Sequence, residues 1–98
     1  MAKKVIWSSK AQNERKEILE YWFICNGNKR YSRKLGSEFT HAAKIISDFN
    51  HIGKKTKRKE IRYYLSNNYK LFYKESDVLI EILTIFDTRR NPKDLKLN

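Results

Sequence analysis

The sequence predicts an α+β fold with the element order β-α-α-β-β-β, in which an αα-hairpin packs on one face of a twisted antiparallel sheet. Two patterns carry this prediction. Apolar residues recur at helical spacing through the first half of the chain, and the second half alternates apolar and polar residues between short turns. With 98 residues the chain is long enough for one core, so residues 1–98 are expected to form one domain.

The first strand is expected over residues 3–8, where Val5, Ile6 and Trp7 suit a half-buried pleat. A helix over roughly residues 10–26 follows, with Ser9 as its cap and Gln12 completing a capping box. Asn26-Gly27 ends it, because glycine tolerates a left-handed backbone. One face of this helix carries Ala11, Ile18, Trp22 and Cys25, with Leu19 beside them and Arg15 expected to snorkel from the gap.

The second helix has the clearer pattern, an apolar stripe with spacings of 4, 3, 4 and 3 formed by Leu35, Phe39, Ala42, Ile46 and Phe49. Gly36 is unfavourable inside a helix, so we expect it to serve a close approach of the two helices. The short connection "NGNKRYS" makes these helices antiparallel neighbours. Trp22, Phe39, Ile46 and Ile82 are predicted core residues.

Three strands are predicted in the second half, over residues 60–66, 69–75 and 78–86. Asn67-Asn68 suits a tight hairpin turn between the first two. The last strand, "VLIEILTIF", is apolar on both faces apart from Glu81 and Thr84, which indicates an interior strand. The sequence leaves open which strand the N-terminal one joins.

Charge is the most informative feature of the composition, because 22 Lys and Arg against 11 Asp and Glu give a net charge of +11. Such a balance is typical of proteins that bind nucleic acid or an acidic partner. Five of these cations lie in the predicted loop between Gly53 and Glu60. Lys57 and Arg58 in this loop are either solvated or in contact with phosphate or an acidic partner.

Other function classes receive little support. His41 and His51 have no ligand at metal-binding spacing, and neither a phosphate-binding glycine loop nor a nucleophile elbow is present, so no metal or cofactor is expected. No apolar run approaches the roughly 20 residues that cross a bilayer. The single cysteine, Cys25, is expected in the core rather than as a reactive thiol, and a reducing cytoplasm fits.

A basic and aromatic sheet surface is the remaining candidate site. If the helices cover the side of Ile61, Tyr63 and Leu65, the opposite side presents Arg62, Tyr64 and Lys70. Such a surface is suited to binding RNA phosphates and stacking bases, although an ordinary solvated sheet face has the same residues.

The chain resembles the RelE/ParE superfamily of toxins from bacterial type II toxin–antitoxin modules along nearly its whole length. The resemblance lies in "VIWSSKAQNERKEILEYW", "EIRYYLSNNYKLFYKES" and "ILTIFDTRRNPKDL", and its sharpest element is Asp87-x-Arg89-Arg90-x-Pro92. Trp7-Ser8, Tyr21-Trp22 and Arg62 seven residues before Tyr69 are further matches. Asn50 stands near the place where the family often has a proline.

The resemblance implies a cytoplasmic toxin that a cognate acidic antitoxin neutralises. Its target is either DNA gyrase, as for ParE-like members, or messenger RNA in the ribosome, which RelE-like members cut without a metal. In a nuclease, Arg62, Lys70 and Arg89 would be the catalytic candidates. RelE-like members place a Tyr or His near the position of Leu95, which cannot transfer a proton. The ending "TRRNP" therefore favours the gyrase class, and a non-toxic nucleic-acid-binding module is a third reading.

The end of the last strand is the most specific prediction. A strand that is buried on both faces holds its terminal side chains in fixed directions, so we expect it to position Arg89 and Arg90 rigidly for binding a target. Pro92 cannot continue a ladder and so helps to fix where the chain turns away. Arg89 matches the family's charged position, whereas Arg90 is expected to point elsewhere.

Overall fold

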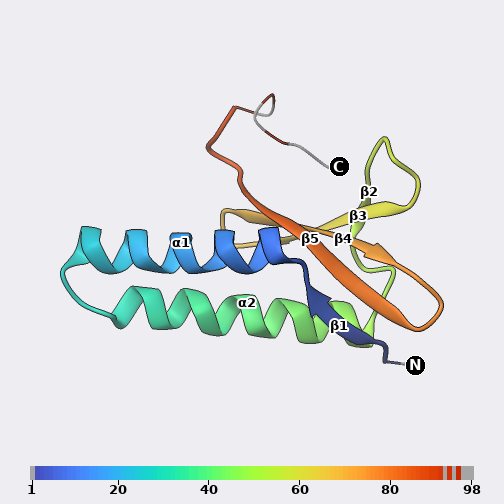
Figure 1. Cartoon of the computed structure of the whole chain (residues 1–98), viewed down its shortest axis with the longest axis horizontal. Coiled ribbons are helices and arrows are strands. Elements are labelled where there is room, and N and C mark those ends of the chain that lie inside the picture. The colour runs from blue at the N-terminus through green and yellow to red at the C-terminus, as the bar shows by residue number, and fades with distance from the viewer. Residues whose placement is uncertain (1, 92, 94, 96–98) are drawn as a thin grey trace.

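The computed structural model describes residues 2–91, 93 and 95. The elements along the chain are β1 (Lys4–Trp7), α1 (Ser9–Asn26), α2 (Arg30–Asp48), β2 (Lys54–Lys55), β3 (Ile61–Ser66), β4 (Tyr69–Glu75) and β5 (Leu79–Asp87). The helices lie side by side and antiparallel, and they extend beyond the sheet at the end where they are joined (Figure 1). The predicted order is confirmed, with the two-residue β2 added inside the predicted loop.

The sheet has the order β1-β5-β4-β3-β2 and is mixed. β2 to β5 are antiparallel neighbours, whereas β1 runs parallel to β5, with Trp7 opposite Ile82. The sheet is therefore not antiparallel throughout. β5 is flanked on both sides, as the apolar sequence of this strand predicted.

Two apolar clusters lie on opposite faces of the sheet. The face that the helices cover, called here the helix face, carries a core made of Ala11, Leu35, Phe39, Ala42, Ile46, Tyr69, Leu71, Tyr73, Ile80, Ile82 and Ile85. The other face, called the far face, carries a smaller cluster of Ile61, Phe72 and Phe86, packed with Tyr63, Leu83 and Leu95. Phe39, Ile46 and Ile82 are fully buried, which confirms them as core residues. Trp22 is half-buried and packs against this core.

The assignment of the β3 faces is the reverse of the one considered from sequence. Tyr64 packs on the helix face, and Arg62 shares that face because it pairs with Tyr73. Ile61 and Tyr63 turn to the far face. Both alternating sets of β3 contain large apolar or aromatic residues, so alternation alone does not reveal which set meets the helices.

Helix α1 begins one residue earlier than predicted. Ser8 is the cap, and its Oγ accepts from the amide of Ala11 at 3.0 Å. The same hydroxyl donates to the carbonyl of Leu83 at 2.9 Å, which ties the start of α1 to β5. Gly27 ends the helix with a φ of 68°, as predicted.

The end of α1 departs from the predicted stripe, because Cys25 is exposed. The helices continue past the sheet there, so no strand covers the last turn (Figure 1). Phe49, at the opposite end of the α2 stripe, is also exposed.

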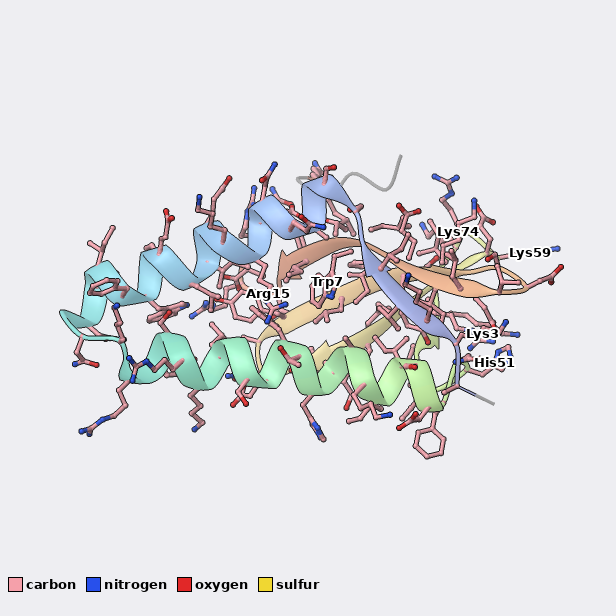
Figure 2. The ribbon with its side chains drawn as sticks, turned by 60° about the horizontal axis from the view of Figure 1, so that its bottom comes forward. Lys3, Trp7, Arg15, His51, Lys59 and Lys74 are labelled. Atoms are coloured by element: carbon pink, nitrogen blue, oxygen red, sulfur yellow. The ribbon has the colours of Figure 1, made fainter. Side chains whose placement is uncertain are left out.

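Arg15 joins three elements, because its guanidinium is bonded within the protein and does not simply extend to solvent as the expected snorkelling implied. Its guanidinium lies 5.0 Å from the centroid of the Trp7 ring. Figure 2 shows Arg15 beside Trp7. The Arg15 Nη2 donates to the Gly36 carbonyl at 3.1 Å and to the Thr40 hydroxyl at 2.8 Å. A Cβ on Gly36 would meet Leu19 at an ordinary 3.6 Å, so the expectation that glycine is needed for close helix packing is wrong.

The connection from α2 to β2 is tied to β4 by Tyr73. The buried Tyr73 hydroxyl donates to the Asn50 carbonyl and accepts from the Gly53 amide, both at 2.9 Å. A Cβ on Gly53 would lie 2.5 Å from that hydroxyl oxygen and 2.8 Å from the Tyr63 carbonyl. Glycine is therefore required at this position.

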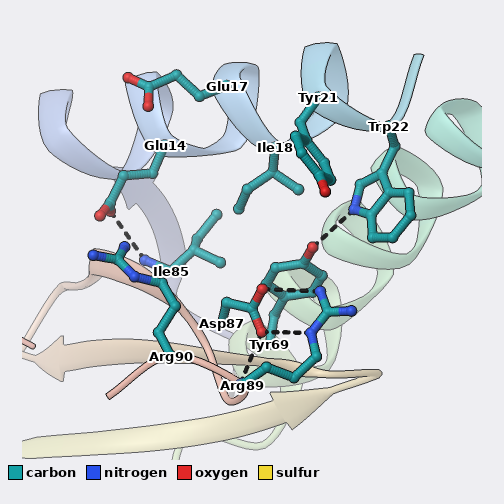
Figure 3. Close-up of a pocket in the computed structure, with 10 residues that line it drawn as sticks. All are labelled: Glu14, Glu17, Ile18, Tyr21, Trp22, Tyr69, Ile85, Asp87, Arg89 and Arg90. Atoms are coloured by element: carbon teal, nitrogen blue, oxygen red, sulfur yellow. Dashed lines mark hydrogen bonds and ion pairs between the residues drawn. The ribbon is translucent and has the colours of Figure 1, made fainter. Parts of the chain in front are cut away.

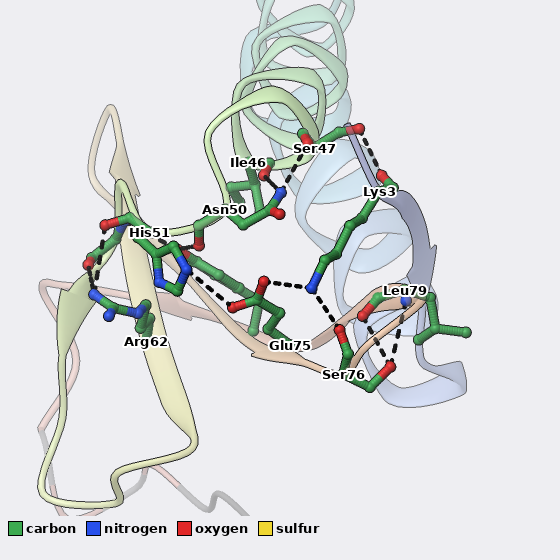
Figure 4. Close-up of polar contacts among 11 residues, drawn as sticks. Lys3, Ile46, Ser47, Asn50, His51, Arg62, Glu75, Ser76 and Leu79 are labelled. Carbon is green, nitrogen blue, oxygen red and sulfur yellow. Dashed lines mark hydrogen bonds and ion pairs between the residues drawn. The ribbon is translucent and has the colours of Figure 1, made fainter. Parts of the chain in front are cut away.

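A polar network holds the N-terminus at the same end of the sheet (Figure 4). The Lys3 ammonium lies 2.6 Å from Glu75 Oε2 and donates to the Ser76 carbonyl at 2.7 Å. His51 Nε2 lies 3.7 Å from the other carboxylate oxygen. The hydrogen bond from Lys3 lowers the pKa of Glu75 below its ordinary value.

Candidate functional site

An open hollow of about 370 Å³ lies between α1 and the end of β5 (Figure 3). Below we call it the Arg89 hollow. Its lining combines three carboxylates, two guanidinium groups and an aromatic cluster, contributed by Glu14, Glu17, Ile18, Tyr21, Trp22, Tyr69, Ile85, Asp87, Arg89 and Arg90. Both arginines that the sequence singled out therefore lie at one concave surface.

Arg89 is held by Asp87, the last residue of β5. Its Nε and Nη2 donate to Asp87 Oδ1 and Oδ2 at 2.9 and 2.8 Å. The Arg89 amide also donates to Oδ1 at 2.9 Å, so both the backbone and the side chain are fixed. The hydrogen bonds from Arg89 lower the pKa of Asp87, and the carboxylate raises the pKa of Arg89. Both groups therefore stay charged at neutral pH.

Aromatic rings form the floor beneath this ion pair. The Arg89 guanidinium lies 5.7 Å from the centroid of the Trp22 ring. The Trp22 indole donates to the Tyr69 hydroxyl at 2.9 Å, and its ring packs edge-on against Tyr21 and Tyr31. Trp22 is fixed by these contacts, so Arg89 rests on a rigid support while half of its side chain stays exposed.

Glu14 closes the open edge of β5 beside the hollow. β1 ends at Trp7, so the backbone of β5 beyond Ile82 has no strand on that side. Glu14 Oε1 accepts from the Ile85 amide at 3.1 Å and from the Thr84 hydroxyl at 2.7 Å. These bonds fix the distance between α1 and β5, which sets the width of the hollow.

Arg90 turns to a different ring. Its guanidinium lies 5.8 Å from the centroid of Phe86, a member of the far-face cluster. Arg89 instead lies over Trp22, which packs against the helix-face core. The two adjacent arginines therefore diverge, as the sequence suggested. Pro92 lies outside the described residues.

The three nuclease candidates do not come together. Arg62 lies on the helix face, and its Nη1 donates to the Gly53 carbonyl at 2.9 Å, so it supports the connection after α2. Lys70 lies on the far face, with its ammonium 4.6 Å from the centroid of the Tyr63 ring. Leu95 packs against the far-face cluster. Arg89 and Arg62 also lie at opposite ends of the strands, because Arg62 pairs with Tyr73 and Arg89 follows Asp87, which pairs with Tyr69.

The remaining predicted contacts lie elsewhere. Lys57 and Arg58 are exposed in the loop between β2 and β3, where Arg58 is 3.1 Å from Glu60. This loop precedes Ile61, which pairs with Lys74, so it lies at the end of the sheet remote from Arg89. Tyr64 is half-buried against the helix-face core rather than displayed on an open sheet surface.

The partners of Arg89 were not predicted from sequence. Asp87 was noted only as part of a motif, and Trp22 only as core. An acid two residues before an arginine at a strand end is a usable local signal. No such local signal exists for the contribution of α1, because Trp22 and Glu14 are separated from β5 by most of the chain. The described residues contain no group of three or more side chains suited to bind a metal, and none of their helices is long and apolar enough to span a membrane.

The family described as "ParE toxin of type II toxin-antitoxin system, parDE" matches residues 5–92. The chain belongs to this ParE toxin family. The match includes both helices, β2 to β5, all of β1 except Lys4, and the Asp87–Arg89 pair, so the resemblance to the RelE/ParE superfamily is confirmed.

A solved structure shows the same fold. A chain of the "Chromosomal ParDE TA system from P. aeruginosa" matches with a TM-score of 0.77 and 14% sequence identity. The alignment covers 90% of this ParE-family chain and 98% of the other. No curated protein matches. At this identity the structural match establishes the fold, and the family match establishes the toxin class.

Proposed function

We propose that this ParE-family toxin arrests growth by inhibiting DNA gyrase and that Arg89 is its principal contact with the target. The separation of Arg62, Lys70 and Arg89 supports this reading over RNA cleavage. Transfer within RNA needs a base, an acid and positive charge around a single phosphate. Arg62 lies on the opposite face from Lys70 and at the opposite end of the strands from Arg89, so these three side chains cannot surround one phosphate.

The Arg89 hollow suits binding a protein surface. The guanidinium is already oriented by Asp87 and supported by Trp22, so little conformational freedom is lost when a partner binds. Arginine and tryptophan are the side chains that most often dominate binding energy at interfaces. Arg90 would contribute from the rim of the hollow.

RNA cleavage is the second candidate, because Lys70 and Tyr63 lie together on the far face. That pair would supply one cation and one hydroxyl. Purified protein should be tested for inhibition of gyrase supercoiling and for cleavage of ribosome-bound message, with Arg89→Ala and Lys70→Ala variants in both assays. Gyrase inhibition that is lost in Arg89→Ala and kept in Lys70→Ala is the expected result. Message cleavage that requires Lys70 would overturn the proposal.

We also propose a cytoplasmic antitoxin partner that presents an acidic, amphipathic segment. The net charge of +11 and the exposed loop containing Lys57 and Arg58 support this proposal. Complementary charge mainly speeds association, and salt screens it. Stopped-flow association should therefore slow steeply as salt rises. An association rate that does not change with salt would contradict an acidic partner.

A further inference from the structure

The tip of the helical hairpin carries four cations within six residues, Lys29, Arg30, Arg33 and Lys34. All four are exposed, and none takes part in the ion pairs found among the described residues. The Lys29 ammonium lies 5.7 Å from the centroid of Phe23. We call these four residues the tip cluster.

The tip cluster works against the stability of the isolated fold. Side chains one turn apart on a helix are about 5–6 Å apart, so Lys29 and Arg33, and likewise Arg30 and Lys34, repel each other. The first turn of α2 contains no acid that would offset this charge. A cluster that costs stability and forms no ion pair with an acid among the described residues is suited to an external polyanion.

A hollow of about 560 Å³ lies beside the tip cluster and is lined by Trp22, Asn26, Asn28, Arg30, Tyr31 and Lys34. No carboxylate lines it, whereas three carboxylates line the Arg89 hollow. Arg, Lys, Asn and Tyr side chains are the usual donors to phosphate oxygens in complexes with nucleic acids. Asn28 is fixed in place, because its Oδ1 accepts from the Arg30 amide at 2.9 Å.

We propose that the tip cluster and this hollow bind the phosphate backbone of a nucleic acid without reading its sequence. An acidic protein segment would match the charge, but an amphipathic segment also needs an apolar surface beside the cations. The exposed Phe23 and Ile24 lie on α1 and do not line the hollow, and Lys29 lies over the Phe23 ring. Apart from the ring of Trp22, the lining offers cations, amides and a phenol, which together suit phosphates.

The test uses fluorescence anisotropy with two labelled probes, a DNA duplex of about 20 base pairs and a single-stranded RNA of about 20 nucleotides. Affinities are measured between about 50 and 200 mM KCl. The test variant is Arg30→Gln/Lys34→Gln. The matched control is Lys16→Gln/Lys44→Gln, which removes the same charge from exposed positions outside the tip cluster, one on α1 and one on α2. Thermal melts of both variants establish that each is folded.

The logarithm of affinity falls with the logarithm of salt by roughly 0.9 per phosphate contact on duplex DNA and roughly 0.7 on single strands. The test variant should therefore lose about 1.8 from the slope on duplex DNA, or about 1.4 on RNA, while the control keeps the parental slope. The probe with the tighter binding identifies the kind of nucleic acid. Equal losses in both variants would show that binding reflects net charge alone and would overturn the proposal. Tighter binding of a polyglutamate probe would overturn it in favour of an acidic protein. The anisotropy measurements and the thermal melts do not require gyrase, so their result does not depend on the proposed target.

Discussion

Asp87 and Arg89 are joined by two parallel hydrogen bonds of 2.9 and 2.8 Å at the point where β5 ends. Two-pronged arginine–carboxylate pairs fix direction as well as charge. The pair lies over Trp22, so the orientation of Arg89 depends on both the last strand and the first helix. At the end of β5, the first of the two adjacent arginines is therefore held in a fixed direction.

Replacing Arg89 should remove toxicity while leaving the fold intact. Arg89→Ala should weaken target binding by about 30-fold or more, the loss typical of an interface hot spot. Its stability should fall by no more than about 1 kcal/mol, because exposed ion pairs contribute little. Arg89→Lys should restore activity only partly, since lysine cannot bind two oxygens in a plane. Growth assays at matched expression and thermal melts measure both effects.

Arg90→Ala is the matched control, because it removes the same group from the adjacent position. Arg90 lies over Phe86 and away from Trp22, so its loss should reduce toxicity much less than the loss of Arg89. Growth arrest by folded Arg89→Ala at the parental level would show that the paired arginines only mark the end of the core.

Asp87→Asn should reduce activity by loosening Arg89 rather than by removing a contact with the target. The amide keeps the shape of the carboxylate but loses the charge that fixes both prongs. We expect a partial loss of gyrase inhibition, smaller than the loss in Arg89→Ala. Fluorescence should also show that the side chains near Trp22 are more mobile than in the parent. Full activity of Asp87→Asn would mean that the ion pair has no role in positioning.

Acid should weaken the fold in part through Asp87. The hydrogen bond from Arg89 lowers the pKa of Asp87 in the folded state. The contribution of Asp87 to the free energy of unfolding is therefore present above the unfolded pKa of about 3.9. It is lost as pH falls through the lower pKa of the folded state. Denaturation between about pH 2 and 5 should show a smaller acid-induced loss in Arg89→Gln than in the parent. NMR titration of Asp87 gives the same comparison directly, and an unshifted carboxyl would contradict the ion pair.

Phe39→Ala should destabilise the protein by about 3–5 kcal/mol, because Phe39 is fully buried in the helix-face core. Phe49→Ala makes the same change on the same stripe at a side chain that is 64% exposed. It should alter stability by no more than about 0.5 kcal/mol. Chemical denaturation compares the two, and equal losses would contradict the placement of α2.

Alanine should have opposite effects at two glycines. Gly36→Ala should stabilise the protein by up to about 1 kcal/mol, because a helix interior favours alanine and the new Cβ meets Leu19 at 3.6 Å. Gly53→Ala should destabilise it by several kcal/mol, because its Cβ would overlap the Tyr73 hydroxyl, which bonds to the Gly53 amide. Thermal melts decide both, and stabilisation of the Gly53 variant would refute the tight packing there.

The local patterns in the sequence were sufficient for the elements and for part of the site. Spacings of three and four residues place α2, and alternation with the Asn67-Asn68 turn places β3 and β4, because these signals depend on neighbours along the chain. The charged ending after an apolar strand singled out Arg89 as a candidate. The sequence also suggested that Arg90 points in another direction than Arg89.

Only the tertiary structure decided which groups meet across the chain. The parallel pairing of β1 with β5, the face of β3 that meets the helices, and the exposure of Cys25 all depend on how the layers are stacked. The support of Arg89 by Trp22 likewise joins residues far apart in sequence. Local sequence fixes the direction of side chains relative to their own element, but burial and contact depend on the position of one element against another. That position is set by the packing of the whole core, which no short pattern encodes.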